Sequence, residues 1–91
     1  MHSKVQLERL IVDVVHTLRD AHMQDALRAF NERVLSLDPE YLFDAPEGAE
    51  PHFKPMFELL LRELAELGTD TTLPLHDREI RATEAMHLAG F

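Results

Sequence analysis

The stretch HTLRDAHMQDAL, residues 16–27, decides the fold of this chain because two apolar series meet in it. Both series have the three- and four-residue spacing of an amphipathic helix, and the first fills a sector about 140° wide. If one straight helix carried both, the second series would lie about 130° around from the first, so a single helix cannot bury both. The first series comprises Leu7, Leu10, Ile11, Val14, Val15 and Leu18. The second comprises Met23, Ala26, Leu27, Phe30, Val34 and Leu37.

Two arrangements of residues 4–37 are compatible with this pattern. In the first, the chain turns near residues 19–22, with Asp20 as the N-cap of a second helix and His22 in its first turn. In the second, one long helix presents its two halves to different partners. We favour the turn, because it buries both series within one small domain.

The stretch HFKPMFELLLRELAELG, residues 52–68, predicts a third helix. Pro55 suits its first turn, and Gly68 suits the position just beyond its end. A stripe of Met, Leu and aromatic residues at helical spacing is typical of a core-facing helix rather than of a cofactor pocket. The stripe consists of Phe53, Met56, Phe57, Leu60, Leu61, Leu64 and Leu67.

A fourth helix is predicted in DREIRATEAMHLAGF, residues 77–91, with Asp77 as its N-cap. Its apolar stripe is thin and consists of Ile80, Leu88 and Phe91. Such a helix takes its stability from docking onto the rest of the domain. Phe91 is the expected anchor.

These elements together predict an all-α fold, a small single-domain helical bundle over residues 1–91. Ser3 is the expected N-cap of the first helix, in a capping box with Gln6. An acidic loop that contains proline and glycine follows the second helix. The four helices are expected near residues 4–19, 21–37, 54–67 and 77–89.

The length and composition of the chain limit what it can do. A domain of 91 residues buries only about 60–65 % of the surface of its unfolded chain, so a large enclosed substrate cavity is not expected. A dimer interface would add burial, so a homodimer is compatible with the sequence. The absence of cysteine excludes disulfides and thiolate metal sites. Since no stretch resembles a membrane span or a signal peptide, we expect a cytoplasmic protein without a membrane partner.

The negative charge is concentrated in one region of the sequence. The net charge is −8, and residues 38–70 carry nine acidic and two basic side chains, a net charge of −7. Such a surface repels a phosphate backbone, and no segment has clustered Lys and Arg. We therefore expect no direct nucleic-acid binding, and a protein partner with a basic surface fits this charge better.

The stretch DPEYLFDAPEGAEP, residues 38–51, is expected to be a loop because it contains three prolines and a glycine. It has five acidic and no basic side chains. Its apolar residues Tyr41, Leu42 and Phe43 either anchor a solvated connection to the core or, with the acids, form a contact for a basic partner. The residue types do not match a calcium-binding EF-hand loop.

A group of candidate metal ligands, His16, Asp20 and His22, lies in the stretch that joins the two apolar series. On the first helix Asp13, His16 and Asp20 share one face, but that face points away from the apolar sector. Exposed side chains four residues apart usually form a weak helix pair, whereas a metal site needs a second shell and a partly dry cavity. Motifs for phosphate binding, serine hydrolysis and zinc proteolysis are also absent from the sequence. We therefore predict no catalytic residue, no metal site and no cofactor.

The favoured function hypothesis is a non-catalytic protein-binding module, such as a regulator, adaptor, inhibitor or assembly factor. It would use the acidic loop together with apolar residues that lie outside the main stripes, such as Val5, Val12 and Leu59. The sequence has no motif by which a family could be named. The residues predicted to contact the partner are Glu40, Tyr41, Phe43, Asp44, Glu47, Glu50 and Leu59.

The alternative hypothesis is a small metal-dependent enzyme or sensor. It requires that folding bring His16, Asp20 and His22 together, with help from a distant imidazole. The available distant histidines are His52, His76 and His87.

Overall fold

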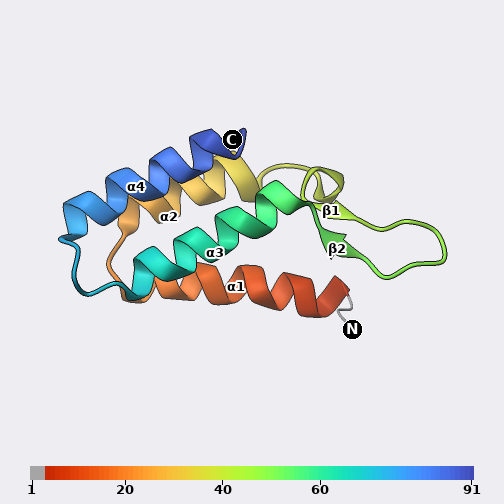
Figure 1. Ribbon diagram of the computed structural model, residues 1–91, viewed down its shortest axis with the longest axis horizontal. Coiled ribbons are helices and arrows are strands. Elements are labelled where there is room, and N and C mark those ends of the chain that lie inside the picture. Colours follow the sequence, from red (N-terminus) through yellow and green to blue (C-terminus); the bar gives the residue numbers. More distant parts are fainter. Residues whose placement is uncertain (1–3) are drawn as a thin grey trace.

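The computed structural model describes residues 4–91, which form four α-helices and a small β-hairpin (Figure 1). The all-α prediction is confirmed, and the predicted cap Ser3 lies outside the described residues. The helices are α1 (Lys4–Asp20), α2 (Gln24–Phe30), α3 (Pro55–Thr69) and α4 (Leu75–Leu88). The shorter elements are a π-helical turn η1 (Asn31–Leu35), a 3-10 turn η2 (Pro39–Tyr41), and strands β1 (Phe43–Asp44) and β2 (His52–Phe53).

The four helices surround one core, and each packs against two neighbours. α1 contacts α2 and α3, and α4 contacts the same two helices, so α2 and α3 occupy opposite corners. The connection from α2 to α3, residues 36–54, therefore has to cross the end of the bundle. It closes that end with Leu42 and Phe53, which are both buried.

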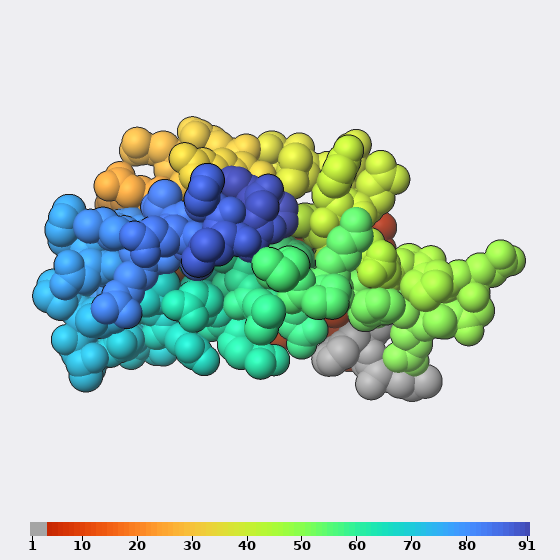
Figure 2. Space-filling view, turned by 45° about the horizontal axis from the view of Figure 1, so that its top comes forward, coloured from red at the N-terminus to blue at the C-terminus, as the bar shows by residue number. Residues whose placement is uncertain are grey.

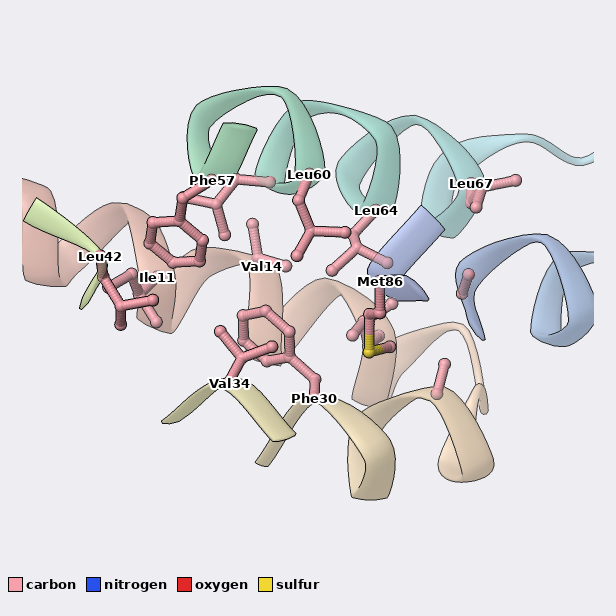
Figure 3. Packing of buried hydrophobic residues seen from close by; sticks show 14 of the residues in the cluster. Ile11, Val14, Phe30, Val34, Leu42, Phe57, Leu60, Leu64, Leu67 and Met86 are labelled. Carbon is pink, nitrogen blue, oxygen red and sulfur yellow. The ribbon is translucent and has the colours of Figure 1, made fainter. Parts of the chain in front are cut away.

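Apolar side chains from all four helices meet in the core. Figure 3 shows Phe57, Leu60 and Leu64 projecting from α3 toward Phe30 and Val34, which follow one another along α2 and η1. The stripes predicted for the first three helices are confirmed at most of their positions. The buried members are Leu7, Ile11, Val14, Leu18, Met23, Ala26, Phe30, Val34, Phe53, Phe57, Leu60, Leu61, Leu64 and Leu67.

The chain turns between α1 and α2, so the prediction of a turn is confirmed and a single long helix is excluded. The turn is a Schellman motif, in which the His22 N–H donates to the Arg19 carbonyl oxygen (3.0 Å) and the Met23 N–H to that of Leu18 (2.9 Å). His22 has the left-handed backbone that this motif requires, with φ of 61°. Leu18 and Met23 are fully buried at the two positions whose apolar contact accompanies the motif.

The predicted start of the second helix is wrong by a few residues. Asp20 is the last residue of α1 rather than an N-cap, and His22 lies in the turn rather than in a first helical turn. α2 begins at Gln24, and Met23, at its N-cap position, makes no side-chain capping bond. The physical reason is that the Schellman motif uses residues up to Met23 to end α1.

The prediction that Gly68 ends the third helix is also wrong, because α3 continues through Thr69. Gly68 is instead a point of close approach between α1 and α3, where a Cβ would overlap the Thr17 methyl group. The Thr17 hydroxyl donates to the Asp13 carbonyl oxygen (2.9 Å), which fixes that side chain. The absence of a side chain at position 68 therefore serves packing and not capping.

The fourth helix begins at Leu75, so the predicted cap Asp77 lies in its first turn. The connection before it is held by Asp70, whose carboxylate accepts hydrogen bonds from the backbone N–H (2.9 Å) and the hydroxyl of Thr72. These two bonds lower the pKa of Asp70 below its ordinary value, and the positive charges of Arg78 and Arg81 add to the effect.

The face of α4 that enters the core differs from the predicted one. Ala82 and Met86 are fully buried, whereas Ile80 is 45 % exposed and Leu88 is 78 % exposed. The small side chain of Ala82 lets α4 lie close to its neighbours, so the core does not need the larger residues. Only Phe91 of the predicted stripe packs as expected, with its ring edge-on to another core aromatic, Phe57 (centroids 6.2 Å apart).

The acidic stretch of residues 38–51 is not a simple loop, because it contains the turn η2 and strand β1, which forms a two-stranded hairpin with β2. Asp44 pairs with His52 and Phe43 with Phe53 in antiparallel register. The two phenylalanine rings stack with centroids 5.4 Å apart, and the N–H of Lys54 donates to the carbonyl oxygen of Leu42 (3.0 Å). These contacts join the two sides of the hairpin. The ring of Phe53 meets that of Phe57 edge-on (centroids 5.2 Å apart), which holds the hairpin against α3, while residues 45–51 project beyond the bundle (Figure 1).

Candidate functional site

A groove of about 880 Å³ runs between α3 and α4, which lie side by side in Figures 1 and 2. Four large apolar side chains line it and stay in contact with solvent: Met56 (52 % exposed), Leu59 (56 %), Ile80 and Leu88. We call this surface the α3–α4 groove.

α3 carries a stripe of exposed residues beside the stripe that faces the core. On α3, Met56 and Leu59 are followed at helical spacing by Glu63 and Glu66, and all four are exposed. Because α3 and α4 run in opposite directions (Figure 1), the start of α3 lies beside the end of α4, which carries Leu88. Three of the four large apolar side chains therefore lie at the end near the hairpin, whereas Glu63, Glu66 and Asp77 lie toward the α3–α4 connection, together with Ile80.

The charged side chains along the groove are unevenly paired. Arg62 forms an ion pair with Glu58 one turn away (3.6 Å), and Arg81 lies close enough to Asp70 to lower its pKa. Four carboxylates line the groove and make no ion pair within residues 4–91. They are Glu63, Glu66, Asp77 and Glu84. The groove thus presents uncompensated negative charge beside an apolar floor.

The apolar surface continues from the groove toward the hairpin. Met56 and Ala89 line both the groove and a neighbouring hollow, whose other walls include Leu37, Tyr41 and Asp44. Tyr41 is 57 % exposed in that hollow. The hollow therefore joins the apolar end of the α3–α4 groove to the base of the hairpin. We call this hairpin, residues 43–53, the acidic hairpin.

The structure separates the predicted contact residues into three places. Leu59 lies in the α3–α4 groove, whereas Tyr41 and Asp44 border the hollow beside it. Phe43 is partly buried by its stacking on Phe53, so it anchors the hairpin, as does the buried Leu42.

The carboxylates of the hairpin region are all exposed. Asp44 lies 3.6 Å from the His52 ring in an exposed cross-strand pair. Glu40 lies in η2, at the foot of the hairpin, and Glu47 and Glu50 lie in the projecting segment. Of the nine acids of residues 38–70, five thus lie in or beside the hairpin, three lie on α3, and Asp70 follows that helix.

The histidine-containing stretch does not assemble into a cluster. His16, Asp20 and His22 are exposed, and Asp20 pairs with the adjacent Arg19 (3.5 Å). Among residues 4–91 no three His, Asp or Glu side chains are placed so that they could hold a metal ion together. The metal-dependent hypothesis therefore has no candidate ligand set in this part of the chain.

Of the four large apolar residues of the groove, three were not predicted from the sequence as contact residues, namely Met56, Ile80 and Leu88. Their size and helical spacing place them in the expected core stripes of the third and fourth helices. For Ile80 and Leu88, the signal that could have identified them is the alanine at position 82, with Met86 one turn later, which together offer α4 an alternative buried face.

A second, smaller groove of about 390 Å³ lies on the other side of α3, against α1. Leu10, which is 42 % exposed, contributes to it together with Asp13, Thr17 and Arg62. Its acids and bases are mixed, and only one large apolar side chain is notably exposed. It is therefore a weaker candidate for a contact surface than the α3–α4 groove.

Comparisons of the chain with protein-family models, with curated proteins and with solved structures found no match. No helix within residues 4–91 combines the length and the apolarity that crossing a membrane requires. The function is therefore inferred from the chemistry of the surface.

Proposed function

We propose that this chain is a non-catalytic protein-binding module whose partner occupies the α3–α4 groove beside the acidic hairpin. The observation that carries the proposal is the exposure of Met56, Leu59, Ile80 and Leu88 along one groove. Single exposed apolar residues are normal on protein surfaces. Several that line one concavity, bordered by charges, mark an interaction site instead.

The core of the domain does not need these four side chains. The inner faces of α3 and α4 are filled by residues such as Leu64 and Met86, which are fully buried. An apolar side chain that remains in water contributes little to folding, but it gains about 25 cal/mol for each square ångström that a partner covers. Leu88, the most exposed of the four, has the most to gain.

The acidic hairpin supports the same proposal through its position. It lies next to the apolar end of the groove, and the shared hollow connects the two. A cluster of like charges beside an apolar contact accelerates the approach of an oppositely charged partner and orients it. Glu47 and Glu50, in the projecting segment, are well placed for this role.

The test compares two double variants of the full chain that remove apolar side chains from different surfaces. Leu59→Ser with Leu88→Ser alters the α3–α4 groove. Val5→Ser with Val12→Ser alters two exposed apolar positions of α1 that the sequence also offered for a contact but that lie outside the α3–α4 groove, and it serves as the matched control. A protein captured from the native host would be identified by mass spectrometry, purified, and titrated calorimetrically against the three forms of the chain.

We expect the groove variant to bind the purified partner at least about tenfold more weakly, which corresponds to about 1.4 kcal/mol, while the control binds like the unaltered chain. Thermal unfolding of all three forms would show that both variants remain folded. Equal affinity of the groove variant and the unaltered chain, or an equal loss in the two variants, would refute the proposal.

A further inference from the structure

We infer that the occupant of the α3–α4 groove is an amphipathic α-helix of the partner, with its apolar end at Met56, Leu59 and Leu88 and a cluster of Lys or Arg over Glu63, Glu66 and Asp77. This inference rests on the proposed function and names the chemistry of the partner. Three features of the groove carry it: its shape, the direction of its polarity and its charge balance.

The shape of the groove fits a helix better than an extended strand. Two neighbouring helices leave between them a trough that accepts the ridge of a third helix. A strand would instead need a free sheet edge, and the only sheet in residues 4–91 is the hairpin, whose strands are two residues each. At 1.5 Å per residue, Met56 and Glu66 are about 15 Å apart along α3, which is the length of about three helical turns.

The polarity of the groove gives the partner helix a direction. Met56 and Leu59 are on the first turns of α3, near Leu88 at the end of α4, so three of the four large apolar side chains lie at this end, while Ile80 lies on the second turn of α4. Beyond them the exposed stripe of α3 continues as Glu63 and Glu66. A complementary helix is therefore apolar toward one terminus and basic toward the other.

The charge balance of the groove selects a basic partner. Of the two arginines that line it, Arg62 forms an ion pair with Glu58, whereas Arg81 makes no ion pair within residues 4–91. Against the single guanidinium of Arg81, the groove has four carboxylates that make no ion pair within residues 4–91. Covering them with an uncharged helix would remove them from water without compensation, which is unfavourable, whereas Lys or Arg would pair with them.

The same charge balance disfavours a second copy of this chain as the occupant. A second α3–α4 face would bring the same four unpaired carboxylates into the contact, with only the guanidinium of its Arg81 to balance them. Like charges placed opposite one another across an interface are destabilising.

The experiment uses three synthetic peptides of about four helical turns, roughly 14 residues, held helical by a side-chain cross-link because free helices of this length are marginal in water. The first carries leucines at helical spacing toward one end and lysines toward the other. The second has glutamates in place of the lysines, and the third has the composition of the first in a scrambled order. Binding to the full chain is followed by NMR of the Met, Leu and Ile methyl groups.

We expect the lysine peptide to bind at least about tenfold more tightly than either of the others. Its methyl shifts should be largest at Met56, Leu59, Ile80 and Leu88 and small at Leu10, in the groove between α1 and α3. The difference in affinity between the lysine and glutamate peptides should decrease as the salt concentration rises, because exposed charges are screened.

A pair of charge-reversed variants tests whether the basic end of the partner helix lies over Glu63 and Glu66. Glu63→Lys with Glu66→Lys should weaken the lysine peptide about tenfold and strengthen the glutamate peptide. Glu8→Lys with Asp20→Lys changes the net charge of the chain by the same amount on α1, where both residues are exposed. This control should leave the preference for the lysine peptide in place.

Equal binding of the lysine and glutamate peptides, or binding of the scrambled peptide at the same strength, would overturn the inference of a basic helix. So would methyl shifts confined to Leu10, or self-association of the chain through the α3–α4 groove. None of these results would change the outcome of the Leu59 and Leu88 test with the natural partner, so a failure of this inference can be distinguished from a failure of the proposed function.

Discussion

Glu79 of α4 caps the start of α2. Its Oε2 accepts a hydrogen bond from the backbone N–H of Ala26 (2.6 Å), and its Oε1 accepts one from that of Asp25 (3.3 Å). The first N–H groups of a helix have no partner within the helix, and a carboxylate beside them also interacts favourably with the helix dipole. In most helices a neighbouring residue in the sequence supplies this cap, but here a different helix does.

Replacing Glu79 should therefore destabilise the domain although the side chain lies at the surface of the bundle. We expect Glu79→Ala to lower the free energy of unfolding by about 0.5–2 kcal/mol, the usual effect of losing a helix cap. The control is Glu84→Ala on the same helix, since Glu84 is exposed and makes no ion pair within residues 4–91; it should change stability by less than about 0.5 kcal/mol. Urea unfolding of both variants measures the difference, and equal effects would mean that the cap contributes nothing.

The turn between α1 and α2 gives a second prediction, at His22. A left-handed backbone costs an L-residue about 1–2 kcal/mol and costs glycine nothing, although glycine loses about 0.5–1 kcal/mol more chain entropy on folding. His22→Gly should therefore raise the free energy of unfolding by about 0.5–1 kcal/mol. His22→Val should lower it by at least about 1 kcal/mol, because a branched Cβ is least compatible with this conformation. Stabilisation by valine would show that the turn does not require the left-handed conformation.

Gly68 allows a prediction about the contact between α1 and α3. In a helix interior alanine is normally about 1 kcal/mol better than glycine, but here its Cβ would overlap the Thr17 methyl. We expect Gly68→Ala to destabilise the domain by up to about 2 kcal/mol, because overpacking costs about 1–3 kcal/mol. In the Thr17→Ser background, which lacks that methyl, the same change should be stabilising. A double-mutant cycle of unfolding free energies gives the coupling, which should exceed about 1 kcal/mol; independent effects would rule out the close contact.

The elements that could be predicted from the sequence are those with local signals. The apolar stripes of α1 and α3 are regular, Pro55 marks the first turn of α3, and the change of phase at residues 16–27 requires a turn. Each of these signals acts within one or two helical turns. These local signals were therefore sufficient to predict α1, α3 and the corner between α1 and α2.

The features that could not be predicted depend on contacts between distant residues. The cap formed by Glu79 is more than fifty positions from Ala26 in the sequence, and the hairpin strands are too short to give an alternating pattern. α4 turns the face of Ala82 toward the core and not the predicted face of Ile80 and Leu88. A prediction based on large apolar residues does not detect this rotation about the helix axis. That rotation decides whether Ile80 and Leu88 belong to the core or to the groove. Of the groove residues, the sequence therefore singled out only Leu59.

The division of α3 into a core face and a groove face can be tested directly. Leu64 is fully buried, so Leu64→Ala should lower the free energy of unfolding by about 2–5 kcal/mol through lost contacts and a cavity. Leu59→Ala, on the same helix but in the groove, should change it by less than about 0.5 kcal/mol. Chemical denaturation of the two variants gives both values. A large loss for Leu59 would mean that the groove residues belong to the folded core and are not available to a partner.

The acidic hairpin provides the last prediction. Glu40, Asp44, Glu47 and Glu50 are exposed, and the one ion pair among them, between Asp44 and His52, is at the surface, where such pairs contribute little. Changing the four to Gln or Asn should therefore alter stability by less than about 0.5 kcal/mol. If the hairpin guides a basic partner to the neighbouring groove, association at low salt should slow by about tenfold, with a smaller change in the dissociation rate.

The matched control for the hairpin neutralises four exposed acids elsewhere, which changes the net charge equally. Suitable positions on α1 and η1 are Glu8, Asp13, Asp20 and Glu32. Stopped-flow association with the purified partner, measured at low and high salt, should show a clearly larger slowing for the hairpin variant, because the attraction depends on distance from the contact and is screened beyond about 10 Å at 0.1 M salt. Equal slowing in the two variants would assign the effect to total charge. In that case the hairpin would serve only to close the end of the bundle through Leu42 and Phe53.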